Sequence, residues 1–282
     1  MVIFTEKKAL KVYLSNFKAL HKTIGFTPTM GALHQGHLSL IKKAQQKNDL
    51  VVVSIFINPT QFDKPEDLIK YPKTIKNDIR LLESVSCDVL FNPSVKEMYS
   101  EHIVSEKFDF DGLEHKMEGE FRNGHFNGVG TIVKTLFEIV APDKAYFGQK
   151  DFQQLQIIKK MVQKHQLKIK VKGCTIFREK DGLAMSSRNE RLNKEQRIAA
   201  PFVHEILQKV SRKFGIENTD TIIEWVEHKF KKNPLLQLEY FTIADEKTLE
   251  TIKSKESNKQ YRAFIAVFAG EIRLIDNIRL KN

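Results

Sequence analysis

Residues 50–57 constrain the fold of this chain more than any other stretch. They read Leu-Val-Val-Val-Ser-Ile-Phe-Ile, a nearly uninterrupted run of apolar and mostly β-branched side chains. A strand that is apolar at successive positions, instead of at alternate ones, is buried on both of its faces. Such strands belong to parallel sheets that helices cover on both sides. The run therefore predicts an α/β fold.

The segments around this run alternate between strand-like and helix-like patterns. Further strands are expected at residues 23–29, 87–91, 144–147 and 169–177. Helices are expected at residues 1–20, 38–47, 74–84, 129–139 and 155–164. This alternation is typical of a doubly wound, Rossmann-like parallel sheet. We therefore predict a domain of this kind at residues 1–177.

The pattern changes after residue 177. Two helix-like segments come first and three strand-like runs follow, at residues 194–214, 220–232, 238–244, 263–268 and 272–280. Helices followed by consecutive strands favour an α+β arrangement with an antiparallel sheet. The sequence thus predicts a smaller C-terminal α+β domain at residues 178–282.

The composition excludes several classes of protein. The chain has 282 residues, 41% of them apolar and 29% charged, as is usual for a globular protein. No apolar run reaches the roughly 20 residues of a membrane-spanning helix, and the N-terminus lacks a signal-peptide pattern. Cys87 and Cys174 lie in strand-like segments and are interpreted as buried free thiols. We therefore expect a cytoplasmic protein with no membrane partner.

The net charge of +11 raises the hypothesis of nucleic-acid binding, because basic surfaces neutralise phosphates. The lysines, however, are interspersed with acidic residues along the whole chain. No segment alternates aromatic and basic residues in the way that base-stacking surfaces do. We therefore predict no nucleic-acid partner, and at most an attraction of small anionic substrates.

A turn rich in glycine and histidine follows the first predicted long strand. Residues 27–37 read Thr-Pro-Thr-Met-Gly-Ala-Leu-His-Gln-Gly-His and lead into a helix. His34 and His37 are spaced so that, at the start of a helix, both side chains project to nearly the same side. Helix N-termini bind phosphate oxygens, and imidazoles placed there can stabilise charge that develops on a phosphate. The turn predicts triphosphate chemistry, and a pair of surface histidines is the alternative.

Lys150 lies in a second turn of this type. Gly-Gln-Lys-Asp at residues 148–151 follows a predicted strand and opens a helix. A lysine there can contact phosphates as a point charge, while Asp151 can cap the helix. Gln61 and Gln154 lie at two strand-end turns, where amides can orient a small polar substrate. Solvent-facing glutamines are the alternative.

A third phosphate signal lies just after the predicted domain boundary. Met-Ser-Ser-Arg at residues 185–188 places two hydroxyls and an arginine in one loop, which makes a candidate phosphate clamp. Alone this motif is common, but one bound triphosphate can use the histidines, Lys150 and the clamp together. No third His or Cys stands at metal-ligand spacing from the two histidines, so we predict no metal site built from protein side chains.

Five blocks of the sequence together resemble one enzyme family. They occupy residues 28–37, 54–62, 124–129, 147–154 and 181–189, in family order and with family-like spacing. On these blocks the chain resembles the pantothenate synthetases (pantoate–β-alanine ligases). That family shares the His-x-Gly-His turn with other nucleotidylyltransferases and with class I aminoacyl-tRNA synthetases. The blocks cover the first two-thirds of the chain. The last third matches only in its length and in its general pattern of helix-like and strand-like segments.

The resemblance implies an ATP-dependent ligation in two steps. Pantoate and ATP would give pantoyl adenylate and pyrophosphate, and β-alanine would then displace AMP to give pantothenate. The resemblance also implies Mg²⁺ as a cofactor, a homodimer, and the small-molecule partners ATP, pantoate and β-alanine.

The resemblance further assigns roles to residues. The catalytic roles fall on His37, His34, Lys150 and Arg188. The residues implied to bind ATP are Met30, Gly31, Ala32, Leu33, His34, Gln35, Gly36, His37, Gly148, Gln149, Lys150, Asp151, Phe177, Met185, Ser186, Ser187 and Arg188. Gln61 and Gln154 would bind pantoate and β-alanine, and residues 124–128 would form a flap over the site. Phe177 and Gln149 stand where the family often has valine and glutamate.

Three alternatives stay open. Another His-x-Gly-His nucleotidylyltransferase would stop after adenylyl transfer to a phosphorylated substrate, so that pyrophosphate release would not require pantoate and adding β-alanine would not release AMP. An RNA-binding relative of the synthetases would use the basic charge and bind tRNA in a salt-sensitive way. An inactive scaffold would have kept the fold and lost the chemistry.

Overall fold

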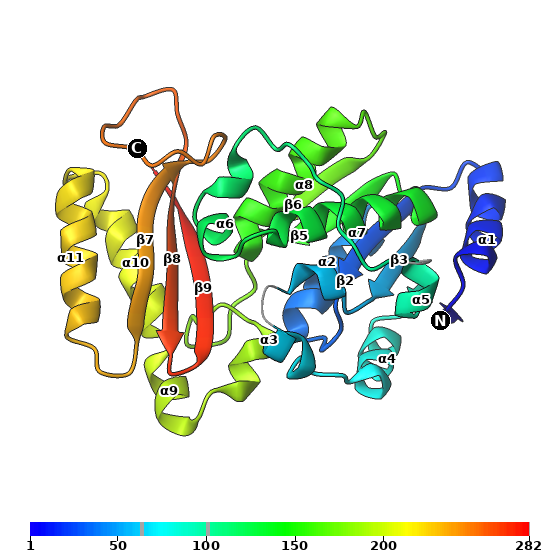
Figure 1. The fold of residues 1–282 in the computed structure, drawn as a ribbon, viewed down its shortest axis with the longest axis horizontal. Helices are drawn as coiled ribbons and strands as arrows, with labels where there is room; N and C mark the ends of the chain where they lie inside the picture. Colours follow the sequence, from blue (N-terminus) through cyan, green and yellow to red (C-terminus); the bar gives the residue numbers. More distant parts are fainter. Residues whose placement is uncertain (63–64, 100–101, 282) are drawn as a thin grey trace. The chain divides into compact units, whose positions relative to one another are not determined.

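The chain divides into two compact units (Figure 1). The computed structural model describes residues 1–62, 65–99 and 102–281. The first unit contains residues 1–149 and 153–175, and the second contains residues 150–152 and 176–282. The division after Thr175 falls two residues before the predicted boundary. The membership of Lys150–Phe152 in the second unit had no signal in the sequence.

The first unit is built on a parallel sheet, as predicted. Its strands are β1 (Val2–Phe4), β2 (Ile24–Thr29), β3 (Leu50–Ile55), β4 (Val89–Phe91), β5 (Lys144–Gly148) and β6 (Lys170–Cys174). They are ordered β1-β4-β3-β2-β5-β6, and every pairing is parallel. Every residue of β3 is buried, because helices cover both faces of the sheet at this strand.

Helices connect these strands. They are α1 (Lys7–Ala19), α2 (Gln35–Gln45), α3 (Pro65–Ile69), α4 (Ile75–Ser84), α5 (Val95–Met98), α6 (Glu118–Phe121), α7 (His125–Val140) and α8 (Phe152–Lys164). Apolar residues of α2 and α4, such as Ile41 and Leu82, share one core cluster with β3. The chain then returns from β4 to build β5 and β6, and right-handed crossovers place α7 and α8 on the opposite face. The helix α1 packs against α7.

The position of β2 determines where a ligand can bind in this unit. The strand lies between β3 and β5, with Phe26 opposite both Val52 and Ala145. From β2 the chain first builds the sheet towards β4 and later returns to build it towards β6. The crevice at such a reversal, at the carboxyl ends of the strands, is the usual ligand site of open α/β sheets.

Two predictions for the first unit were wrong in detail. The predicted helix at residues 1–20 begins only at Lys7, because Val2–Phe4 form an edge strand that is too short to show a period. The predicted flap at residues 124–128 is instead the N-cap and first turn of α7, with His125, Phe126 and Gly128 buried. Glycine and histidine in this turn concealed the helical pattern.

The second unit has the predicted α+β arrangement. The strands β7 (Gln237–Asp245), β8 (Tyr261–Ala269) and β9 (Ile272–Leu280) form an antiparallel sheet in the order β7-β8-β9. The helices are α9 (Lys194–Ala199), α10 (Phe202–Lys213) and α11 (Thr219–Lys231). Apolar faces of α10 and α11 pack on this sheet in one core cluster. The predicted helix at residues 194–214 is broken into two, because Pro201 lacks the N–H that would continue it.

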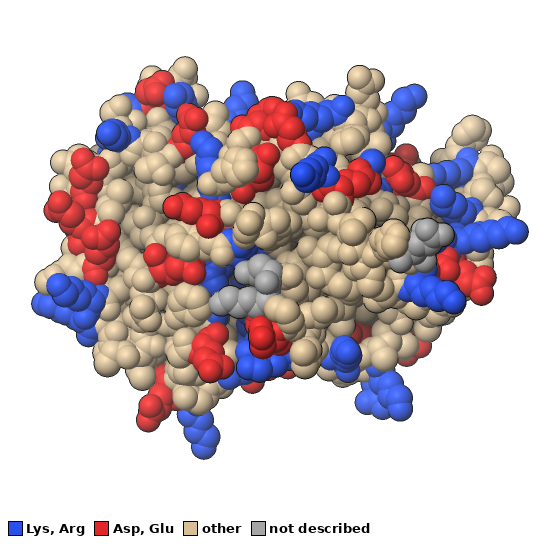
Figure 2. All heavy atoms as spheres, in the orientation of Figure 1, with Lys and Arg blue, Asp and Glu red and all other residues tan. Residues whose placement is uncertain are grey.

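The surface carries both signs of charge. On the face drawn in Figure 2, Lys and Arg side chains are interspersed with Asp and Glu. None of the helices formed by the described residues has the length and apolar character needed to cross a bilayer.

Both cysteines are buried free thiols, as the sequence predicted. Burial raises the pKa of Cys87 to about 12, and it also raises the pKa of Cys174. Because the reactive thiolate is then scarce near pH 8, we expect both thiols to react with a disulfide reagent far more slowly in the native chain than in denaturant. A colorimetric thiol titration measures this difference. Rapid reaction of the native chain would contradict the buried placement.

Candidate functional site

Polar turns follow β2, β3 and β5 of the first unit. The glycine-histidine turn ends β2, residues 58–61 follow β3, and Gly148 and Gln149 end β5 and begin the short helix η3 (Gln149–Asp151). Because β2 pairs with both of its neighbours in parallel, the carboxyl ends of these strands meet at one edge. Lys150, Phe177 and the Met185–Arg188 loop belong to the second unit.

The two histidines face each other at the N-terminus of α2. His34 is the N-cap, with extended backbone angles of φ −142° and ψ 175°. Its backbone N–H donates to Nδ1 of His37 at 3.3 Å, and the two ring centroids are 4.0 Å apart. Since Nδ1 of His37 accepts a hydrogen bond, a neutral His37 carries its proton on Nε2. His37 can therefore donate a hydrogen bond to an anion through Nε2, at a helix end that favours negative charge.

Asp78, on α4, fixes the backbone of this turn. Its carboxylate is buried and accepts from the N–H of Ala32 at 3.1 Å and the N–H of Leu33 at 2.8 Å. Gly31 and Ala32 both have left-handed backbone angles, φ 85° and φ 47°. Ala32 is sterically strained in that region, so hydrogen bonds from a buried carboxylate are what hold the turn in place. The hydroxyl of Thr74 also donates to Asp78.

A cavity of about 250 Å³ lies beside this turn in the first unit. Met30, Gly31 and Asp78 contribute to its wall, together with Phe56 and Asn92. Neither of the two histidines lines it. The cavity thus touches the start of the predicted ATP-binding turn, on the side where Asp78 holds the backbone.

The backbone of Gln61 is clamped against the start of α7. Gln61 ends the short helix η1 (Pro59–Gln61), and its carbonyl oxygen lies 2.7 Å from Nδ1 of His125 and 3.3 Å from a guanidinium nitrogen of Arg122. A carbonyl oxygen only accepts, so Nδ1 of His125 is the donor in this contact. Gly128 is required here, because a Cβ on it would lie 2.1 Å from the carbonyl oxygen of Thr60.

Asn58 ties the same turn to two other elements. Its buried side chain donates to the carbonyl of Gly128 at 3.1 Å and accepts from the Tyr99 hydroxyl at 2.6 Å. Burial raises the pKa of Tyr99. The sequence blocks and the residues next to them contained Asn58, Arg122 and His125, but nothing in their spacing indicated that they position Gln61.

Two adjacent glutamines of α8 differ in their surroundings. Gln153 is buried and bridges a loop: its amide nitrogen donates to the carbonyls of Leu113 and Lys116, at 2.8 Å and 2.6 Å. Its amide oxygen accepts from the N–H of Glu118 at 3.0 Å. Gln154, the predicted pantoate ligand, is half-buried in the same turn. Gln153 is therefore a structural residue that sequence reasoning passed over.

The candidate clamp of the second unit is carried on a braced loop. Ser186 caps the short helix η4 (Ser187–Arg191), its hydroxyl accepting from the N–H of Arg188 at 3.3 Å. Glu179 accepts from the amide of Asn189 at 2.8 Å and from Arg197 at 2.5 Å. These contacts fix the loop on both sides of the clamp.

Phe177 lies at the start of this loop. Its side chain is 40% exposed, and its carbonyl oxygen accepts from the N–H of Met185 at 3.0 Å. The phenylalanine side chain is therefore not part of a packed core. Its backbone is held in register with the clamp.

Lys150 and Arg188 are half-buried cations of the second unit. Arg178, Arg197 and Arg262 each pair with a carboxylate at 2.5–2.7 Å. In contrast, within residues 1–62, 65–99 and 102–281 the side chains of Lys150 and Arg188 have no hydrogen-bond or ion-pair partner. Among the described residues nothing neutralises these two positive groups, which makes them candidates to bind an anion.

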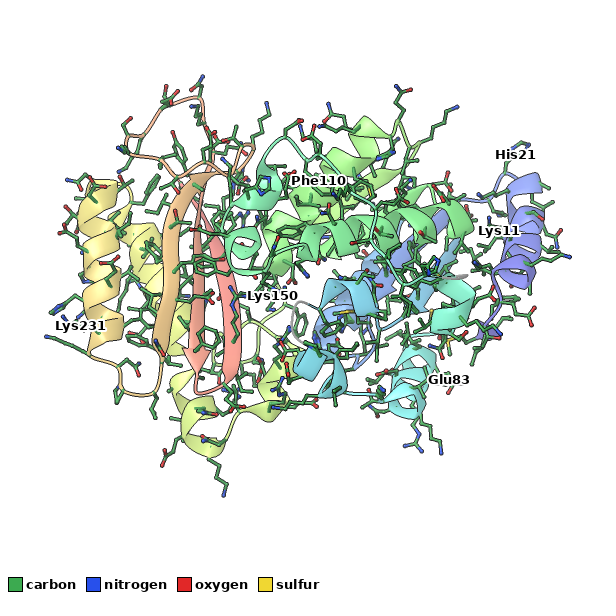
Figure 3. The ribbon with its side chains drawn as sticks, viewed as in Figure 1. Lys11, His21, Glu83, Phe110, Lys150 and Lys231 are labelled. Atoms are coloured by element: carbon green, nitrogen blue, oxygen red, sulfur yellow. The ribbon has the colours of Figure 1, made fainter. Side chains whose placement is uncertain are left out.

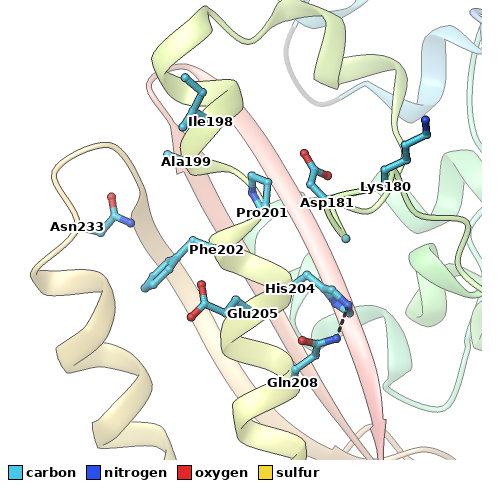
Figure 4. Close-up of a pocket in the computed structure, with 11 residues that line it drawn as sticks. Lys180, Asp181, Ile198, Ala199, Pro201, Phe202, His204, Glu205, Gln208 and Asn233 are labelled. Carbon is cyan, nitrogen blue, oxygen red and sulfur yellow. Dashed lines mark hydrogen bonds between the residues drawn. The ribbon is translucent and has the colours of Figure 1, made fainter.

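A second cavity, of about 640 Å³, lies within the second unit (Figure 4). Lys180, Asp181 and His204 line it, and Gln208 and His204 are hydrogen-bonded at 3.1 Å. Burial and the nearby Arg178 lower the pKa of His204. None of the clamp residues lines this cavity, so it is distinct from the predicted phosphate contact. The described part of the chain holds no group of three or more His, Cys, Asp or Glu side chains suited to a metal ion.

We expect Asp78→Asn to destabilise the turn that carries the histidines. The amide nitrogen would replace one of two acceptor oxygens and would face a backbone N–H that it cannot bond. This should lower the free energy of unfolding by roughly 1–3 kcal/mol, measured by urea denaturation. Asp220→Asn, an exposed change on α11, is the matched control and should stay within about 0.5 kcal/mol of the parent. Equal stability of both variants would contradict the role of Asp78.

Known proteins are similar to this chain in sequence and in fold. The chain matches the Pantoate-beta-alanine ligase family over residues 2–279. It is 55% identical to a pantothenate synthetase of Christiangramia forsetii and 52% identical to one of Flavobacterium psychrophilum, over the full length of both chains in each case. Among solved structures, a pantothenate synthetase of Thermus thermophilus superposes with a TM-score of 0.93 at 35% identity, covering 100% of both chains.

A pantoate-beta-alanine ligase from Francisella tularensis, solved with beta-gamma ATP and beta-alanine, also superposes well. Its TM-score is 0.83 at 36% identity, and the match covers 99% of this chain and 97% of that one. Sequence and fold agree across these comparisons. The chain belongs to the pantoate-beta-alanine ligase, or pantothenate synthetase, family.

Proposed function

We propose that this enzyme condenses pantoate with β-alanine to give pantothenate, with consumption of ATP and through a pantoyl-adenylate intermediate. A carboxylate is a poor acyl donor, and adenylation gives it a good leaving group. In the first step a pantoate carboxylate oxygen attacks the α-phosphorus and pyrophosphate leaves. In the second step the β-alanine nitrogen attacks the acyl carbon, its proton is lost, and AMP leaves.

The histidine pair is proposed to act in the first step. Nε2–H of His37 would donate to an oxygen of the phosphate that is attacked, where negative charge builds up. His34 would orient His37, since its backbone N–H already donates to Nδ1 of His37. The remaining residues of the turn, from Met30 to Gly36, would surround ATP at the N-terminus of α2.

Lys150 and Arg188, whose side chains have no partner among the described residues, are proposed to bind the phosphates. Lys150 and Arg188 would take up the charge of the departing pyrophosphate, with Ser186 and Ser187 as hydrogen-bond donors beside Arg188. Gly148, Gln149, Asp151, Phe177 and Met185 are proposed to complete the ATP site. Their support is their place next to Lys150 and in the clamp loop.

Gln61 and Gln154 are proposed to hold pantoate and the incoming β-alanine. The clamped backbone of Gln61 supports this role, because a fixed backbone limits the positions from which its side chain can meet a substrate. The Francisella tularensis relative was solved with beta-alanine and beta-gamma ATP, which is the pair of ligands that the proposal requires.

In this scheme Mg²⁺ binds together with ATP and not at a protein site of its own. The described residues offer no side-chain cluster for it. Proteins commonly hold Mg²⁺ through the phosphates of a nucleotide, where it neutralises their charge. The ion would therefore enter with the nucleotide, and Lys150 and Arg188 would add to the neutralisation that it provides.

The observation that carries the proposal is the pair of facing histidines at the end of β2, where the direction of sheet building reverses, in a chain of this family. Incubation of the purified enzyme with ATP, Mg²⁺, pantoate and β-alanine should yield pantothenate, AMP and pyrophosphate in equal amounts, detected by mass spectrometry. Omission of β-alanine should abolish the formation of pantothenate and AMP and should limit pyrophosphate release to about one equivalent per enzyme. Pyrophosphate release that does not require pantoate, with no AMP released on addition of β-alanine, would instead indicate a nucleotidylyltransferase that stops at adenylyl transfer.

His37→Ala is the matched variant for this assay. Loss of one donor to a developing negative charge typically lowers kcat by about 100-fold or more, and we expect that loss for pyrophosphate release. The circular dichroism spectrum should remain that of the parent. Retention of most of the activity would show that the pair is structural.

We also propose that the chain acts as a homodimer in the cytoplasm. The family resemblance supports the dimer, and two buried free thiols fit a reducing compartment. Light scattering at micromolar concentration should give twice the chain mass of 32.7 kDa. A monomer under those conditions would contradict the proposal.

A further inference from the structure

We propose that Asn277 is a positioning residue for Lys150. Through Asn277, the strand β9 holds the proposed phosphate-binding lysine in a fixed position relative to the clamp loop at residues 185–188. The proposal rests on the proposed function, in which Lys150 and Arg188 bind the phosphates of ATP. It assigns to the C-terminal sheet a part in the chemistry that no block of the sequence indicated.

The contact is direct. Asn277 lies in β9, opposite Phe264 of β8, and its side-chain nitrogen donates to the carbonyl oxygen of Lys150 at 2.8 Å. Asn277 is only 2% exposed. Figure 3 labels Lys150 beside β9. The two residues are 127 positions apart in the sequence, and Lys150–Phe152 belong to the same unit as β9.

The orientation of the Asn277 amide is fixed by chemistry. Arg262 donates to its oxygen at 2.6 Å, and a guanidinium can only donate. The amide nitrogen must therefore face the Lys150 carbonyl, which can only accept. An amide satisfies both partners at once, whereas a carboxylate would satisfy Arg262 and place an oxygen against the oxygen of Lys150.

Arg262 makes this arrangement rigid. It is 5% exposed and bonds to Glu246 through two nitrogens, at 2.9 Å and 2.7 Å. Its guanidinium also lies over the ring of Phe152, 4.1 Å from the centroid. The same arginine thus holds Asn277 on one side and the residue two positions after Lys150 on the other. The segment from Lys150 to Phe152 is held at both ends.

The neighbouring residue of β9 holds the clamp loop. Asp276 is buried and binds Arg178 through both oxygens, at 2.6 Å and 2.9 Å. Arg178 opens the loop that leads to Arg188, and it also donates to the carbonyl of Gly182 at 3.0 Å. Consecutive residues of one strand therefore hold the backbone segments that carry Lys150 and Arg188. Their spacing matters, because both are proposed to bind one triphosphate.

A purely structural role for Asn277 is the competing explanation, and a double-mutant cycle separates the two. The cycle combines Asn277→Asp with Lys150→Met and measures the affinity for a non-hydrolysable ATP analogue by calorimetry. Asn277→Asp keeps the shape and the partner Arg262 but loses the bond to Lys150. Asn218→Asp, which changes the N-cap of α11 to an equally good cap, is the matched control with the same change of charge.

We expect Asn277→Asp to weaken analogue binding by about tenfold in the chain that has Lys150, which is the effect of one lost hydrogen bond. In the Lys150→Met chain the same change should cost less than about twofold, because the group that it positions is gone. Asn218→Asp should leave the affinity within about twofold in both chains. Asn277→Ala, which adds no charge, should reproduce the cycle if the aspartate variant folds poorly.

An equal loss in both chains would overturn the positioning role and leave Asn277 a structural residue. Unchanged affinity in the Lys150 chain would overturn it as well. Failure of the parent enzyme to bind the analogue is a different outcome: it would overturn the proposed function, and the role of Asn277 would fall with it.

Discussion

The pairing of β2 with both β3 and β5 is the constraint on which the site depends. Because all of these pairings are parallel, the turns that follow the three strands emerge at one edge of the sheet. The direction of sheet building reverses at β2, and this reversal opens the crevice where α/β sheets bind ligands. The histidine pair, the Gln61 turn and the start of the Gly148 turn thus share one location for a topological reason.

Topology brings the turns together, but buried polar side chains give them their shape. Asp78 accepts from the backbone of the histidine turn, Asn58 bonds to the start of α7, and Asn277 donates to the carbonyl of Lys150. The exposed fraction of each of these three residues is 2% or less. A buried polar group without a partner is costly, so each of these side chains strongly favours the one backbone conformation that satisfies it.

The sequence was sufficient for the fold class and for the residues that carry the polar turns. Periodicity identified β3 and the antiparallel C-terminal sheet, and the sequence blocks pointed to His34, His37 and Lys150. The supporting contacts could not be read in this way. Asp78 is hydrogen-bonded to Leu33, 45 residues away in the sequence, and Asn277 to Lys150, 127 residues away. The sequence around Asp78 shows only an amphipathic helix and that around Asn277 only a strand, so neither pattern indicates these contacts. The short strand β1 and the first turn of α7 were missed because their patterns are too short or too rich in glycine.

The net charge of the chain says less about where an anion can bind than the pairing of individual charged side chains does. The chain carries +11, yet three buried or half-buried arginines are already neutralised: Arg178 by Asp276, Arg197 by Glu179, and Arg262 by Glu246. Each of these pairs braces a loop or a strand and has no charge to offer a ligand. Lys150 and Arg188 are half-buried and have no side-chain partner among the described residues, so the binding of an anion would compensate their partly desolvated charge. If Lys150 and Arg188 bind the triphosphate as proposed, selectivity depends on these individual side chains and on how rigidly their backbones are held, and less on the overall basicity of the surface.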